Sequence, residues 1–140
     1  MKAVAVVALL ALCLTTGYAR AAEPTVASMP PVVVETVPVA GATGVDPETK
    51  EIRVTFSKDM KTEKMWSFVQ VTKKSYPKTT GKPHFTDKRT IVLPVELAAG
   101  HTYVLWINRG RYNAFRDTDG QPAVPYLLVF KTGEDKESAP

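Results

Sequence analysis

The residues best suited to bind a ligand are arginine and aromatic side chains in the C-terminal third of the chain. They lie in or just before residues 108–124, and they are Trp106, Arg109, Arg111, Tyr112, Phe115 and Arg116. A guanidinium group forms paired hydrogen bonds with carboxylate or phosphate, and an aromatic ring stacks on a sugar or another flat group. This composition would suit an anionic glycan or a peptide. The alternative is that the rings fill one end of the fold while the arginines pair with Asp117 and Asp119.

Asp117 and Asp119 belong to the sequence Asp-Thr-Asp-Gly, which has the form of half a calcium-binding loop. Calcium takes six to eight oxygen ligands, and a calcium loop of this type needs further acids at fixed spacing. None follows here, because the chain continues Gln-Pro-Ala-Val. We therefore expect a turn in which aspartate side chains accept backbone N–H groups and Gly120 has a positive φ. Asp117 and Asp119 are only a weak calcium candidate.

The two histidines, His84 and His101, are far apart in the sequence and have no Cys or Glu at the spacing of metal ligands. This argues against a zinc site. The chain also has no nucleophile elbow and no phosphate-binding loop. We therefore expect neither a catalytic site nor a cofactor. Catalytic groups in a β fold can converge from distant loops, so a small hydrolase with a site at the loop end is one alternative. Acids clustered beside His84 or His101 in a cleft would favour it.

Residues 1–21 have the composition of a secretory signal peptide. Met1-Lys2 gives a basic start, residues 3–14 are apolar, and Ala19-Arg20-Ala21 is a small-x-small cleavage pattern. The apolar run is too short for a transmembrane helix, which needs roughly 20 residues. We therefore expect an exported protein, periplasmic or extracellular, with no stable membrane insertion after cleavage.

Cleavage after Ala21 would change the charge and the thiol content of the chain. Loss of Lys2 and Arg20 leaves 16 basic and 14 acidic residues, a net charge of +2, which argues against nucleic acid as a partner. The single cysteine, Cys13, leaves with the leader, so the mature protein can form no disulfide and depends on packing for stability. About 119 residues remain, enough for one domain.

The mature chain is predicted to be all-β. Residues 22–31 are small residues and proline, typical of an extended linker, and residues 134–140 are charged, typical of a flexible tail. Between them, short β-rich runs alternate with turn residues. These runs are 32–37, 52–56, 66–71, 82–86, 89–93, 102–107 and 126–130. Seven such runs predict a sandwich or barrel, with Asp87-Lys88 as a hairpin turn.

Leu97 to Tyr103 has the layout of a tyrosine corner. A turn containing Gly100 precedes a strand, and Tyr103 lies near the strand start. In such a corner the tyrosine hydroxyl bonds to the backbone a few residues upstream. An ordinary strand tyrosine is the alternative.

Several segments, taken in order, resemble the bacterial Ig-like domain of the SbsA type, known from S-layer and other surface proteins. They are 37–45, 52–60, 89–94, 97–103, 117–120 and 130–132, and together they span residues 32–133. The resemblance implies an immunoglobulin-like β-sandwich of about seven strands in an extracytoplasmic structural or adhesive module without catalysis. Two features depart from the family. Such domains usually occur in long multidomain chains, and residues 108–124 are longer and more basic than usual.

The last two predicted strands are neighbours in this family, and both are apolar on two faces. If Tyr103 and Phe130 face the core, the alternation of side chains turns a second apolar set outward. This set is Val104, Trp106, Leu127 and Val129. Such a face is either covered or used for binding. The cover would be residues 108–124, with Tyr112 or Phe115 on Trp106.

The sequence thus predicts an exported, non-catalytic Ig-like module for binding or structural interaction. Its partner would be a protein or glycan of the cell envelope, and self-association is possible. A carbohydrate-binding accessory module that uses residues 108–124 is a further alternative. An exposed, coplanar pair among Trp106, Tyr112 and Tyr126 would favour that alternative.

Overall fold

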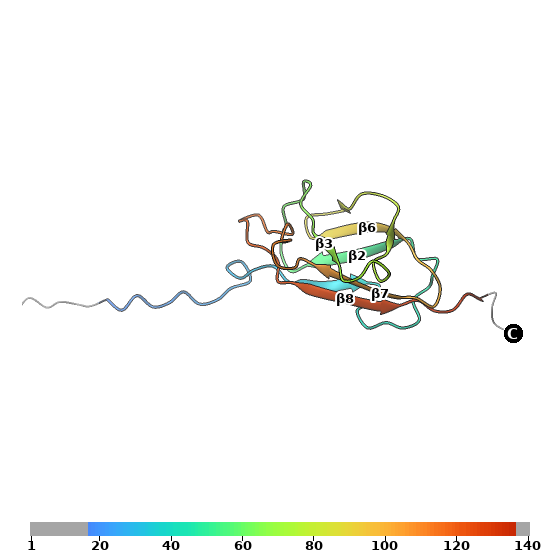
Figure 1. The fold of residues 1–140 in the computed structure, drawn as a ribbon. Helices are drawn as coiled ribbons and strands as arrows, with labels where there is room; N and C mark the ends of the chain where they lie inside the picture. The colour runs from blue at the N-terminus through green and yellow to red at the C-terminus, as the bar shows by residue number, and fades with distance from the viewer. Residues whose placement is uncertain (1–16, 137–140) are drawn as a thin grey trace, which may run out of the picture.

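The computed structural model describes residues 17–136 and is all-β within them (Figure 1). The eight strands are β1 Val33–Val37, β2 Glu51–Phe56, β3 Phe68–Gln70, β4 Lys78–Thr79, β5 His84–Phe85, β6 Thr90–Glu96, β7 Thr102–Ile107 and β8 Tyr126–Lys131. The predicted β-sandwich is confirmed, and the short strand β4 is additional to the seven predicted runs. Residues 1–16 of the predicted leader and 137–140 of the predicted tail lie outside the described residues.

The strands form two antiparallel sheets. One has the order β1-β2-β6-β4, with β5 also paired to β6, and the other has the order β3-β7-β8. Alternation along the strands defines the core between them. In β2, Ile52, Val54 and Phe56 are buried, whereas Arg53 between them is exposed. In β7 the buried residues are Tyr103, Leu105 and Ile107.

The predicted hairpin turn at Asp87 joins β5 to β6. The Thr86 N–H donates to the Thr90 carbonyl across the turn. One carboxylate oxygen of Asp87 accepts the backbone N–H groups of Arg89 and Thr90, at 2.7 and 2.8 Å. The bond from the Arg89 N–H is the main cause of the lowered pKa of Asp87. An aspartate that caps its own turn in this way stabilises the hairpin.

The tyrosine corner is confirmed. The Ala98 N–H donates to the Tyr103 hydroxyl at 2.7 Å, and the Tyr103 ring packs against Phe130 with 5.4 Å between ring centroids. Gly100 supplies the positive φ of the turn, +61°. The His101 N–H donates to the Thr132 hydroxyl, which ties the corner to the end of β8.

Residues 22–31, predicted to be an extended linker, are folded in their second half. The N–H groups of Ser28 and Met29 donate to the Thr25 carbonyl and form a turn. The Lys58 ammonium then donates to the carbonyls of Ala27 and Met29, at 2.7 and 3.1 Å. In Figure 1 the described residues before this turn extend away from the sandwich as a blue tail, and the turn itself lies next to the sandwich. The ordered unit therefore begins before residue 32.

Candidate functional site

Asn108 divides the segment 108–124 into a projecting part and a buried part. It is 1% exposed and has a positive φ of 57°. Its side-chain oxygen accepts the Phe115 N–H at 3.0 Å, and its side-chain nitrogen donates to the carbonyls of Phe115 and Ala123 at 2.9 and 3.1 Å. These bonds tie the segment together across its base. Residues 109–112 project into solvent, whereas Phe115, Asp117 and Ala123 are buried.

Phe115 lies in the core and is not available to a ligand, which corrects its assignment to the ligand-binding set. It is 0% exposed, and its ring contacts Phe56 and Phe68 with centroid separations of 5.2 and 5.1 Å. The bonds from Asn108 to its backbone turn its side chain inward. For the same reason Phe115 cannot cover Trp106.

The side chain of Arg116 forms hydrogen bonds to other residues of the segment 108–124. Its guanidinium donates to the Asn113 carbonyl and side-chain oxygen at 3.1 and 2.7 Å, and to the Gly120 carbonyl at 3.2 Å. All three guanidinium nitrogens are thus engaged, which leaves Arg116 poorly placed for an external ligand. Within residues 17–136, no ion pair joins Arg116 to Asp117 or Asp119.

Asp117 is the acceptor at the centre of a buried network. It is 0% exposed, and one carboxylate oxygen accepts the N–H groups of Asp119 and Gln121 at 3.0 and 2.8 Å. The other oxygen lies 2.9 Å from the Lys58 ammonium. Burial is the largest single influence on the pKa of Asp117 and raises it. The Lys58 hydrogen bond, the two backbone bonds and the lysine charge together outweigh burial and lower the pKa.

This network accounts for the turn that resembled half a calcium loop. Gly120 has the expected positive φ, +85°, and Asp117 accepts backbone N–H groups as expected. The positive charge beside Asp117 is the chain's own Lys58. Within residues 17–136, no group of three or more His, Cys, Asp or Glu residues is placed to hold a metal ion.

Residues 109–112 form a tight turn that displays two arginines. The Arg109 N–H donates to the Tyr112 carbonyl at 2.8 Å, and the Tyr112 N–H donates to the Arg109 carbonyl at 3.0 Å. Gly110, between them, has a positive φ of 55°. The Arg109 guanidinium lies over the Trp106 ring, 5.1 Å from its centroid. The Arg111 guanidinium lies over Tyr112 and donates to its hydroxyl at 3.0 Å. Neither arginine forms an ion pair with an acid in the described part of the chain.

The structure brings Val104, Trp106, Leu127 and Val129 together. Val104 pairs with Val129 and Trp106 pairs with Leu127 across β7 and β8, on the face turned away from the core. Val69 of β3 pairs with Trp106 and joins them, a residue that the sequence analysis did not place. We call this set (Val69, Val104, Trp106, Leu127 and Val129) the outer apolar face. Leu127 is 40% exposed and the other four are half-buried.

A cavity of about 380 Å³ opens at the side of the sandwich, between β3 and β4. Four aromatic residues line it, and we call them the aromatic cleft: Trp66, Phe68, Tyr76 and Tyr112. Trp66 and Tyr76 precede the segment 108–124 by more than thirty residues, so no local pattern joined them to Tyr112. Trp106, Tyr112 and Tyr126 make no ring contacts with one another among the described residues.

A family model described as bacterial Ig-like domain matches residues 27–132. The chain belongs to the bacterial Ig-like domain family. This confirms the family inferred from the sequence, and the match begins within the folded turn before β1. No curated protein matches the chain.

Two solved structures share a broadly similar shape with this Ig-like domain. They are the S-layer protein rSbsC(31–844) and domains 1–6 of the surface layer protein SbsC. Each is 17% identical, with a TM-score of 0.44, over 78% of this chain and 14% of the solved chain. This Ig-like domain therefore spans a small part of the length of either structure.

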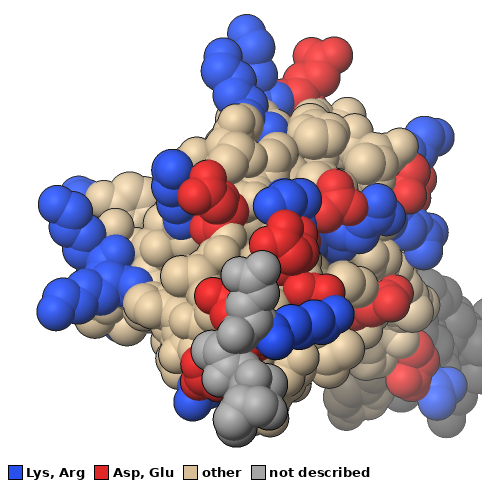
Figure 2. Space-filling model, turned by 90° about the vertical axis from the view of Figure 1, so that its right-hand side faces the viewer, with Lys and Arg blue, Asp and Glu red and all other residues tan. Residues whose placement is uncertain are grey.

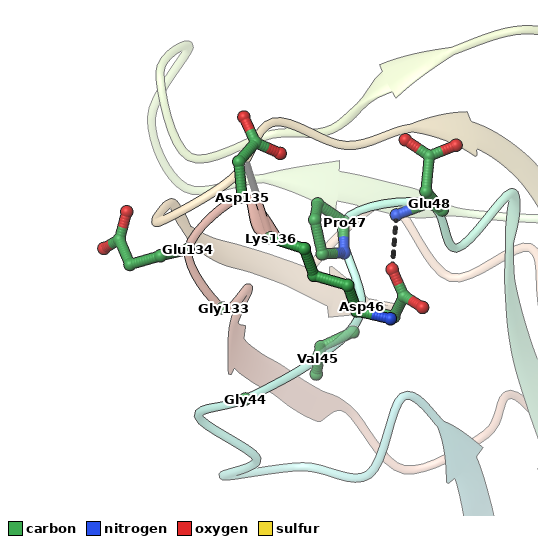
Figure 3. Close-up of a pocket in the computed structure, with 9 residues that line it drawn as sticks. All are labelled: Gly44, Val45, Asp46, Pro47, Glu48, Gly133, Glu134, Asp135 and Lys136. Atoms are coloured by element: carbon green, nitrogen blue, oxygen red, sulfur yellow. Dashed lines mark hydrogen bonds between the residues drawn. The ribbon is translucent and has the colours of Figure 1, made fainter. Parts of the chain in front are cut away.

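The Ig-like domain has a second, acid-lined cavity of about 680 Å³ between residues 44–48 and 133–136. In Figure 3 the carboxylate of Glu134 points away from those of Glu48 and Asp135, and Asp46 accepts the Glu48 N–H at 2.9 Å. Asp and Glu alternate with Lys and Arg on the end of the molecule that Figure 2 shows. Neither histidine lines this cavity. This cavity therefore lacks the acids beside His84 or His101 that would favour the hydrolase alternative.

Both histidines are bonded to backbone carbonyls. A ring nitrogen of His101 lies 2.7 Å from the Lys74 carbonyl, and the ring packs against Tyr103. A ring nitrogen of His84 lies 3.2 Å from the Lys82 carbonyl. In addition, no helix within residues 17–136 of the Ig-like domain has the length and hydrophobicity needed to cross a membrane.

Proposed function

We propose that the chain is an exported, non-catalytic Ig-like module that binds a protein partner through the outer apolar face, in the cell envelope or outside the cell. The observation that carries this proposal is the register of β7 with β8 and β3, which places five apolar side chains on the solvent side of one sheet. Each sheet of a two-layer sandwich has only one side covered by the core, so solvent-facing side chains are normally polar. The outer side of β2 follows that rule with Arg53 and Thr55.

The charge beside the face indicates the chemistry of the partner. Arg109 lies on Trp106 at one end of the face and forms no ion pair within residues 17–136. Trp and Arg are the side chains most often found at the energetic centre of protein interfaces. A partner surface with apolar side chains and an adjacent Asp or Glu would complement both features.

Two observations support the setting. The basic, apolar and small-residue pattern of residues 1–21 is typical of a leader that directs export. The family match is to a bacterial Ig-like domain over residues 27–132. Together they favour a module that works on the outer side of the inner membrane.

Site-specific photo-crosslinking of the mature protein in envelope extract tests this function. A photoreactive residue at Leu127 should give one discrete cross-linked species, and the same residue at Thr55, on the outer side of the other sheet, should give none. In a second variant the photoreactive residue is placed at Val129 and Leu127 is changed to Glu. This variant should lose the cross-link, because a new carboxylate is poorly tolerated in an apolar interface. Its circular dichroism spectrum should be unchanged, which would show that the fold is intact.

Equal cross-linking at Leu127 and Thr55 would contradict a specific face. A species of twice the protomer mass would identify a second copy of the chain as the occupant. In that case the outer apolar face would be a binding surface as proposed, but it would bind a second copy of the chain and not a different protein.

A further inference from the structure

The aromatic cleft lies at the side of the sandwich, and it borders the outer apolar face, because Val69 lines both. Its walls come from β3 in one sheet and from Thr79, Gly81 and Pro83 next to the edge of the other, with Leu93 of β6 also lining it. Its volume of about 380 Å³ is within the range of sites that bind small molecules.

Three of the four rings that line the cleft, all but Phe68, carry a polar group. Tyr112 is 51% exposed, and Trp66 and Tyr76 are half-buried. Burial raises the pKa of Tyr76 above its ordinary value. The hydroxyls of Tyr76 and Thr79 have no hydrogen-bond partner within residues 17–136, and both residues line the cleft. Rings with free hydroxyls offer apolar surface and hydrogen bonds at the same site.

A positive charge lies against Tyr112, one of the rings that line the cleft. Arg111 donates to the Tyr112 hydroxyl at 3.0 Å and forms no ion pair with an acid in the described chain. No carboxylate is among the residues that line the cleft. A guanidinium without an acidic partner is suited to a ligand carboxylate, which it can hold with two hydrogen bonds.

We propose that the aromatic cleft binds an oligosaccharide that carries a carboxylate group. The C–H faces of the sugar rings pack on Trp66 and Tyr112, sugar hydroxyls bond to Tyr76 and Thr79, and the carboxylate reaches Arg111. An extended peptide fits less well, because it would need a strand edge to pair with. The two edges here, β3 and β4, have only three and two residues. The site does not use Trp106 or Leu127 of the proposed partner face, although Val69 borders both.

The two tryptophans of the chain allow each site to be followed separately. Trp66 lies in the aromatic cleft and Trp106 on the outer apolar face. In a Trp106→Phe variant of the mature protein, fluorescence therefore reports on the cleft alone. The acidic probes are a galacturonic acid tetrasaccharide and a muramic-acid-containing peptidoglycan disaccharide. Each is compared with a neutral oligosaccharide of the same length as a control. We expect a saturable change in Trp66 emission with an acidic probe, and binding about tenfold weaker for its neutral counterpart.

Arg111 and Arg109 form a matched pair for the test, since they lie in the same turn and carry the same charge. Arg111→Ala should weaken binding of the acidic probe about tenfold and leave the neutral one unchanged. Arg109→Ala should change neither. Tyr112→Ala should weaken both, with amide NMR spectra confirming that each variant is folded.

Three outcomes would overturn the proposal. They are no response of Trp66 to either acidic probe, equal losses in the two arginine variants, and equal competition by a hexaglutamate peptide. The last would identify the cleft as a general site for acidic chains. Cross-linking at Leu127 does not depend on Trp66 or Arg111. A negative result in the fluorescence experiment would therefore not contradict the proposed partner face, and a negative result in the cross-linking experiment would not contradict the proposed sugar site.

Discussion

At the residue scale, this sandwich is held at its turns by single side chains that bond to backbone groups. Tyr103 accepts the Ala98 N–H, Asn108 bonds to Phe115 and Ala123, and Asp117 accepts two N–H groups and an ammonium. Each of these side chains is buried, where an unpaired polar group is costly. Replacing any one of them should therefore have a measurable effect on stability.

Tyr103→Phe should lower the free energy of unfolding by about 1–3 kcal/mol. The change removes the hydroxyl and leaves the Ala98 N–H without its partner, while the ring contact with Phe130 is kept. Urea denaturation followed by fluorescence measures the difference. Tyr126→Phe is the matched control, since the Tyr126 hydroxyl has no hydrogen-bond partner among the described residues, and its effect should be within a few tenths of a kcal/mol. An equally small effect for Tyr103→Phe would mean that the hydroxyl bond contributes nothing.

Lys58→Met should destabilise the fold by about 3–5 kcal/mol, because it leaves the buried Asp117 carboxylate without its cation. It also removes the two bonds that hold the carbonyls of Ala27 and Met29. Thermal unfolding gives the stability, and limited proteolysis should show earlier cleavage near residue 29. Lys61→Met, at an exposed lysine nearby, is the control and should be close to neutral. Unchanged stability in Lys58→Met would show that the ion pair is not needed.

The lowered pKa of Asp117 predicts an acid-labile contribution to stability. Because the folded pKa lies below the ordinary aspartate value of about 4, the unfolded chain binds the proton first as the pH falls. The contribution is complete above that value and is lost as the pH falls through the folded pKa. Asp117→Asn should flatten the stability curve below about pH 4. The pKa of Asp87 is lowered as well, so part of the slope should persist. An unaltered slope in Asp117→Asn would contradict the network.

At the element scale, the segment 108–124 behaves as two parts. Residues 109–112 project and present Arg109 and Arg111, whereas the stretch from Phe115 to Ala123 completes the core at one end of the sandwich. Asn108 makes this division possible because it combines a left-handed backbone conformation with three side-chain hydrogen bonds. Asn tolerates that conformation better than most residues.

Asn108→Gly should separate these two contributions. Glycine keeps the positive φ without strain but leaves the Phe115 N–H and the Ala123 carbonyl unpaired, so we expect a loss of about 2–4 kcal/mol. Hydrogen exchange should show lost protection at the Phe115 amide. Lys64→Gly replaces the other non-glycine residue with positive φ and should leave that amide protected. If the Phe115 amide stays protected in Asn108→Gly, another group holds the segment.

At the scale of the whole molecule, one small sandwich carries two neighbouring candidate surfaces, which meet at Val69. The outer apolar face covers the three-stranded sheet, and the aromatic cleft lies where β3 and β4 leave the side open. Arg109 lies on the first and Arg111 beside the second, although only Gly110 separates them. Two rigid surfaces joined through one turn would allow a single module to hold a protein and a glycan together.

Processing of the leader is the prediction that concerns the whole chain. If residues 1–21 direct export, the exported protein should begin at Ala22 or within a few residues of it. Intact-mass analysis of protein recovered from the periplasm or the medium measures this. Retention of Met1 would contradict both the leader and the net charge of +2 of the mature chain.

The sequence by itself determined the features that depend on local pattern. Period-two alternation defined the buried side of β2 and β7, and a glycine turn before Tyr103 defined the corner. Local pattern suffices there because a strand turns alternate side chains to opposite faces and a turn fixes its own backbone geometry.

Only the tertiary structure decided which distant residues meet. Phe115 has the composition of a ligand-binding residue, yet the bonds from Asn108 turn it into the core. Asp117 pairs with Lys58, and Tyr112 lines the same cavity as Trp66 and Tyr76. These pairs are separated by tens of residues, and their contacts depend on how the two sheets pack. Burial, charge pairing and cleft shape are set by that packing, so no spacing within one segment could have revealed them.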